Sequence, residues 1–96
     1  MTTTRPRASD DLRDVLTRLE RAREHQLAAL PETTDPVAAA HRASVERILE
    51  DIRVARRQLD ANAYGTCTTC GGRIDEERLA RHLWATKCTA CADRVG

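Results

Sequence analysis

Apolar residues recur along the first two thirds of the chain with the spacing of amphipathic helices. Between residues 9 and 30 they fall within an arc of about 140° when each residue advances by about 100°, which is one stripe of a helix. This stripe comprises Leu12, Val15, Leu16, Leu19, Ala22, Leu27 and Leu30. A second stripe, between residues 36 and 63, comprises Val37, Ala38, Val45, Ile48, Leu49, Ile52, Ala55, Leu59 and Ala63. The pattern predicts two long helices that bury their stripes against each other.

Turn and capping residues predict where these helices begin and end. Pro31 ends the first helix, and Asp35 followed by Pro36 is a start signal for the second. A connection this short makes the two helices fold back as an antiparallel hairpin. The chain is therefore expected to consist of a flexible polar tail at 1–8, a helical hairpin at 9–63 with its tip at 31–36, and a C-terminal module at 64–96.

The C-terminal module contains all four cysteines of the chain. They form two Cys-x-x-Cys pairs, Cys67 with Cys70 and Cys88 with Cys91, separated by 17 residues. This is the pattern of a tetrahedral structural zinc site whose four ligands are all thiolates. Such a site has no open position for water or substrate, so it predicts one structural Zn²⁺ and no enzymatic activity. A redox dithiol or an iron–sulfur cluster is the alternative use of the same cysteines.

Between the two pairs, the run Asp75-Glu76-Glu77 has the acidic character of a helix start. The predicted fold is thus mainly α. It consists of an antiparallel two-helix hairpin, or coiled coil, followed by a small four-cysteine zinc-finger module with one short helix.

Composition and charge narrow the functional classes. The chain has 96 residues, with 16 Lys plus Arg against 15 Asp plus Glu and a formal net charge of +1. This balance, without a basic stripe, argues against a protein that binds nucleic acid through bulk electrostatics. No segment has the apolar length of a transmembrane helix or a signal peptide, so we expect a cytoplasmic protein with no membrane partner. The reducing cytosol favours zinc thiolates over disulfides.

The finger sequence resembles the C4 zinc finger of the DksA/TraR family. The resemblance is carried by the run from Tyr64 to Leu79, YGTCTTCGGRIDEERL, and by the pair at Cys88 and Cys91. Together with the hairpin it covers residues 9–92. It implies a small bacterial or phage transcription regulator, a monomer that binds RNA polymerase core or holoenzyme directly and needs no sequence-specific DNA contacts. The hairpin would enter the secondary channel and bring acidic residues of the tip close to the catalytic centre.

The tip matches the family motif in part. The family's Asp-Pro-Val-Asp-x-Ala reads Asp35-Pro-Val-Ala38-Ala-Ala40 in this chain, so the first acid and the last alanine match and the second acid is missing. Glu32 precedes Asp35 in the same turn and could supply another negative charge. Asp35 is also a good N-cap for the helix that begins at Pro36, so both a structural and a polymerase-facing role stay open for it.

In the finger, the resemblance implies an interface or nucleotide region around Arg78, His82 and Trp84. Family members use basic residues there to help hold guanosine tetraphosphate, and this chain keeps only Arg78, with Ala92 after the last cysteine. A strong nucleotide site is therefore not expected. Trp84 is expected to pack against the zinc module or the base of the hairpin, and an exposed anchor for a partner is the alternative. The alternative for the whole chain is a zinc-finger module that docks on a protein, the ribosome or DNA without DksA-like activity.

Overall fold

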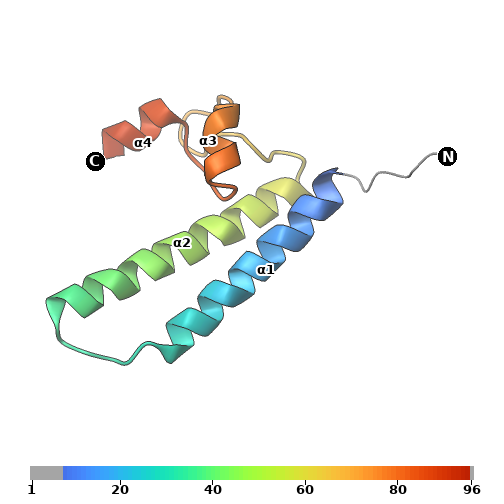
Figure 1. The fold of residues 1–96 in the computed structure, drawn as a ribbon. Helices are drawn as coiled ribbons and strands as arrows, with labels where there is room; N and C mark the ends of the chain where they lie inside the picture. The colour runs from blue at the N-terminus through green and yellow to red at the C-terminus, as the bar shows by residue number, and fades with distance from the viewer. Residues whose placement is uncertain (1–7, 96) are drawn as a thin grey trace.

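The computed structural model describes residues 8–95 and contains four helices within them. Two long helices, α1 (Ala8–Ala29) and α2 (Pro36–Asp60), lie side by side as an antiparallel hairpin (Figure 1). Two short helices, α3 (Glu76–Arg81) and α4 (Thr89–Val95), belong to the finger. The predicted fold class is confirmed, and α4 is a second short helix in the finger. Residues 1–7 of the predicted tail lie outside the described residues, and Ala8 is already helical.

The tip of the hairpin follows the predicted turn chemistry. The helix α1 ends at Ala29 because Leu30 precedes Pro31, and a residue before proline is disfavoured in the α conformation. At the other side of the loop, Asp35 is the N-cap of α2, and its Oδ2 accepts a hydrogen bond of 3.2 Å from the backbone N–H of Ala38. The capping role predicted for Asp35 is confirmed.

The C-terminal end of α2 differs from the prediction. The helix ends at Asp60, three residues before the expected boundary at 63, and Asn62 takes a left-handed conformation with φ of 59°. The backbone N–H of Ala63 donates to the carbonyl of Gln58 at 2.7 Å, and that of Asn62 donates to the carbonyl of Leu59 at 3.1 Å. These two bonds form a Schellman motif. Asparagine tolerates the left-handed conformation, so Asn62 was the signal for this end.

The main core lies at the base half of the hairpin, where the finger covers it. Its buried residues are Leu16, Ile52, Ala55 and Leu59, of which the first three have no exposed surface. Three finger residues, Tyr64, Leu83 and Trp84, pack against this cluster. The expectation that Trp84 packs against the base of the hairpin is therefore confirmed.

Two members of the predicted stripes are exposed. Ala22 is exposed, and the side chain of Val37 is 77% exposed. The finger covers only the base half of the hairpin, so no third element within residues 8–95 shields Val37 next to the loop at the free end (Figure 1). The periodicity of a two-helix hairpin identifies its inward side, and burial of that side also depends on what packs over it.

Ion pairs connect α1 to α2 away from the tip. The carboxylate of Glu20, whose side chain is 14% exposed, accepts hydrogen bonds from Arg56 and, at 3.2 Å, from Arg53. Arg53 also pairs with Glu24 at 2.8 Å, and Arg13 pairs with Asp60 at 2.9 Å. Burial raises the pKa of Glu20, but the hydrogen bonds from Arg56 and Arg53 outweigh it, and the net pKa is below 4.5.

None of the helices between residues 8 and 95 combines the length and the apolar character needed to cross a lipid bilayer.

The lowered pKa of Glu20 leads to a pH-dependent prediction. Because the folded-state pKa lies below 4.5, the ionised carboxylate stabilises the fold above that pH and loses its effect as the pH falls through the folded-state value. Glu20→Gln should therefore cost about 1 kcal/mol near neutral pH, since both arginine partners are partly exposed. Urea denaturation of the wild type and of Glu20→Gln should show that this difference in the free energy of unfolding vanishes in acid. A difference that persists in acid would contradict the ion-pair account.

Candidate functional site

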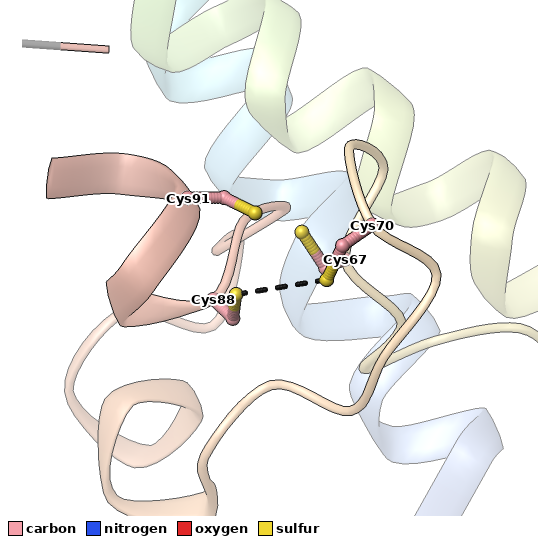
Figure 2. A group of neighbouring side chains, drawn as sticks. All are labelled: Cys67, Cys70, Cys88 and Cys91. Atoms are coloured by element: carbon pink, nitrogen blue, oxygen red, sulfur yellow. Dashed lines mark hydrogen bonds between the residues drawn. The ribbon is translucent and has the colours of Figure 1, made fainter. Parts of the chain in front are cut away.

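The four cysteines converge at one point of the finger. Their sulfur atoms all lie within 4.8 Å of one another, and none forms a disulfide. Figure 2 shows the four side chains directed toward a common centre, with the sulfurs of Cys70 and Cys88 3.8 Å apart. Cys67 and Cys91 are buried, Cys88 is half-buried and Cys70 is exposed. The structure thus brings together all four predicted ligands.

The first pair is held in a tight turn of the backbone. Thr66 and Arg73 form an isolated antiparallel bridge at the base of this turn. Inside it, the N–H of Cys67 donates to the carbonyl of Gly72 at 2.8 Å, and the N–H of Gly71 donates back to the carbonyl of Cys67 at 2.9 Å. Gly71 has φ of 78°, a conformation that favours glycine. Hence the turn closes on itself and directs both thiols to one side.

Backbone N–H groups of this turn also point at the sulfurs. The N–H of Thr69 lies 3.4 Å from the sulfur of Cys67, and the N–H of Gly72 lies 3.4 Å from the sulfur of Cys70. Hydrogen bonds of this kind stabilise a thiolate relative to a thiol. The left-handed conformation of Gly71 and the N–H of Gly72 thus both shape the turn that aims amides at the thiols.

The second pair is placed by α4. Cys88 immediately precedes this helix, Cys91 lies in its first turn, and the carbonyl of Cys88 accepts from the N–H of Ala92 at 2.9 Å. One helical turn therefore brings the two thiols to the same side. Sequence reasoning missed this helix, although the helix-forming residues Ala90 and Ala92 gave a weak signal for it.

Side-chain and backbone contacts join the two pairs. Both the N–H and the hydroxyl of Thr68 donate to the carbonyl of Thr86, at 2.8 and 3.1 Å. Ile74 and Ala85 are buried with Cys67 and Cys91 in a small apolar cluster beneath the sulfurs. This arrangement encloses one side of the centre and leaves the side of Cys70 open to solvent.

The thiols of Cys67 and Cys91 differ in acidity because their hydrogen-bond partners differ. Hydrogen bonds from the backbone of Cys70 and Cys88 lower the pKa of Cys67, whereas the hydrogen bond with the side chain of Cys88 and burial raise the pKa of Cys91. Four thiolates this close would repel one another, so they ionise together only around a cation. A soft divalent metal fits this donor set, and Cys67, Cys70, Cys88 and Cys91 are the residues that would hold it.

The tip residues lie at the free end of the hairpin, far along the molecule from the finger (Figure 1). Glu32, Asp35 and Ala40 are all exposed. The N–H of Asp35 donates to the hydroxyl of Thr33 at 3.0 Å, which orders the loop before the cap. The structure therefore places Glu32 and Asp35 in one exposed loop, and Ala40 one turn into α2.

Of the three residues of the expected interface or nucleotide region, the structure brings two together. The rings of His82 and Trp84 meet edge to face with centroids 6.0 Å apart, and the guanidinium of Arg23 lies 5.9 Å from the Trp84 ring. The Nε of Arg78 donates instead to the backbone carbonyl of Lys87 at 2.9 Å. One edge of the Arg78 guanidinium is therefore engaged within the finger.

Comparison with solved structures identifies the architecture. The RNA polymerase binding protein and transcriptional regulator Dks of Chlamydia trachomatis superposes with a TM-score of 0.70 at 17% identity, covering 97% of this chain and 92% of that one. Transcription factor DksA2 of Pseudomonas aeruginosa superposes with a TM-score of 0.66 at 20% identity, covering 95% and 84%. This chain has the DksA fold. Its four-cysteine cluster is consistent with the DksA/TraR type of zinc finger.

The sequence matches of this chain cover less of it than the structural matches do. No protein-family model matches the chain. An uncharacterized protein of Aquifex aeolicus is 36% identical over 47 residues. That match covers 49% of this chain and 32% of the relative, so it spans about a third of the relative's length.

The cysteine geometry predicts one zinc ion per chain. Its binding free energy, on the order of 10 kcal/mol, should contribute directly to folding of the finger. Cys70→Ser should therefore unfold the finger while the hairpin keeps part of its helicity. Elemental analysis and circular dichroism check both points. Metal-free protein whose helicity and melting temperature equal those of the untreated protein would contradict the metal site.

Proposed function

We propose that this protein is a zinc-stabilised transcription regulator that binds RNA polymerase directly, with its hairpin tip in the secondary channel. The observation that carries the proposal is the full-length likeness to an RNA polymerase binding protein, combined with an acidic residue at the free end of the hairpin. Zinc holds the finger, the finger supports the base of the hairpin, and the tip is the part that acts.

The free end of the hairpin suits insertion into a confined site. Between residues 28 and 44 the charged residues are Glu32, Asp35 and Arg42, whereas half of the residues between 45 and 60 are charged. The exposed residues of α2 next to the tip include Ala39, Ala40 and Ala43. Small uncharged side chains keep this end narrow, and few charges have to lose their water on entry.

Asp35 is the residue proposed to affect the catalytic centre. One carboxylate oxygen, Oδ2, accepts the capping bond from Ala38 and so fixes the direction of the group at an exposed position. A carboxylate held there would act on the polymerase's catalytic magnesium region by electrostatics, which strengthen where water is excluded. The protein itself would carry out no covalent chemistry.

The partner is RNA polymerase core or holoenzyme, which the protein binds as a cytoplasmic monomer. Residues 9–63 carry nine basic and 11 acidic groups, and residues 64–96 carry five and four, so neither part favours DNA. Guanosine tetraphosphate is not required in this proposal, because this chain keeps only Arg78 of the family's basic residues and the Nε of Arg78 donates to the backbone carbonyl of Lys87.

A second candidate is a docking module that keeps the DksA fold without its effect on transcription. The specific observation in its favour is Ala38, which stands where the family motif has its second acid. Binding to polymerase alone therefore does not separate the two candidates, and the tip has to be tested.

Substitutions at the tip make the test. Asp35→Asn should leave the melting temperature and polymerase binding nearly unchanged, since asparagine caps helices as well as aspartate does. It should remove most of the effect on transcription in a purified system. Asp35→Ala should in addition cost about 1 kcal/mol through the lost cap. Ala38→Asp should strengthen the effect of the wild-type protein.

The control is Asp14→Asn, an equivalent change at an exposed position near the base of α1. It should alter neither stability nor transcription. Co-purification with core polymerase establishes binding for every variant. If all of them bind and neither Asp35→Asn nor Ala38→Asp changes transcription, the docking module is the correct description.

A further inference from the structure

The backbone carbonyl just before each cysteine pair accepts a hydrogen bond from the side chain of a helix residue. The Nε2 of Gln58 in α2 donates to the carbonyl of Thr66 at 2.8 Å, and the Nε of Arg78 in α3 donates to the carbonyl of Lys87 at 2.9 Å. Thr66 is the residue before Cys67, and Lys87 is the residue before Cys88. The same kind of side-chain hydrogen bond therefore occurs once at the start of each pair.

The position of these bonds matters because a peptide unit is planar. The carbonyl of Thr66 and the N–H of Cys67 belong to one rigid unit, so a bond to the carbonyl fixes the direction of the N–H as well. That N–H donates to the carbonyl of Gly72 at 2.8 Å. The peptide leading into Cys67 is thus anchored on both sides, which fixes where the side chain of Cys67 departs from the backbone.

The peptide leading into Cys88 is anchored in a comparable way. Its carbonyl, on Lys87, accepts from the Nε of Arg78 at 2.9 Å. The carbonyl of Cys88 itself accepts from Ala92. The first cysteine of each pair is therefore held from outside its own turn.

Gln58 connects the centre to the hairpin through both its main chain and its side chain. Its backbone carbonyl accepts from the N–H groups of Ala61 and Ala63 at the end of α2, while its side chain reaches Thr66. Gln58 and Arg78 are both half-buried, so these bonds are partly shielded from competing water. The donor on Arg78 is charged, which makes its bond the stronger of the two.

We propose that Gln58 and Arg78 are positioning residues of the metal centre, which preorganise the thiolates and so raise the affinity of the finger for zinc. The proposal rests on the proposed zinc site and adds a hairpin residue to its supporting shell. Outer hydrogen-bond partners of metal ligands commonly have this effect. Arg78, expected from the sequence in an interface or nucleotide region, thereby has a role toward the metal.

The test measures zinc affinity by competition with a chelator in the full-length protein. Gln58→Met keeps the side-chain length, Arg78→Met keeps an unbranched apolar stem, and both remove the donor. Each should weaken zinc binding by about tenfold, and the double variant by about a hundredfold, because the two bonds act on different pairs. Hydrogen exchange at the N–H of Cys67 should become faster in Gln58→Met.

Two controls separate positioning from general loss of stability. Arg81→Met removes an exposed arginine from the same helix as Arg78. Tyr64→Phe removes a side-chain bond of 2.7 Å to the carbonyl of Leu83, which is of the same kind but not next to a cysteine. Both controls should bind zinc within about twofold of the wild type, although Tyr64→Phe should lower the melting temperature.

Three outcomes would overturn the proposal. If wild-type protein binds zinc and both methionine variants bind it equally well, the positioning role is wrong and the zinc site stands. If Tyr64→Phe loses as much affinity as the methionine variants, the effect is general stability. If wild-type protein binds no zinc, both the metal site and the positioning role are wrong. Should a methionine variant not fold, Arg78→Lys, which keeps the charge without the Nε donor, should show the same loss of affinity.

Discussion

The mutual repulsion of four thiolates is the constraint on which the rest of the structure depends. Sulfur atoms within 4.8 Å of one another ionise together only around a cation. Little else holds the finger: α3 and α4 have six and seven residues, and the apolar cluster under the sulfurs is small. A metal bound at this point would therefore determine whether residues beyond α2 fold.

The finger stabilises the hairpin by packing against the base of the hairpin. Tyr64, Leu83 and Trp84 cover the cluster around Leu16 and Ile52, and Gln58 bonds directly to the backbone beside Cys67. In the part of the chain that the structure describes, the other half of the hairpin has no such cover and consists of the two helices alone. This division gives a supported base and a slender free end, which suits a protein that acts through its tip while it binds through its body.

The sequence allowed the two long helices, the turn between them and the four-cysteine cluster to be predicted because each depends on residues close in sequence or on fixed spacing. The apolar period located α1 and α2, the Asp35-Pro36 pair gave the start of α2, and the two Cys-x-x-Cys pairs gave the cluster. Burial of Val37 was predicted wrongly because periodicity does not reveal that the finger stops short of the tip. The bonds of Gln58 and Arg78 to backbone carbonyls could not be predicted, because they depend on how distant segments meet in space.

The most direct test of the account is site-specific cross-linking from the tip. A photoreactive amino acid at Thr34, an exposed loop position beside Asp35, should cross-link to the part of core RNA polymerase that surrounds its catalytic centre. The same amino acid at Arg81, exposed on the finger, should cross-link only to the outer surface of the polymerase. Cross-links from Arg81 together with none from Thr34 would contradict the account, because the protein would then bind without inserting its tip.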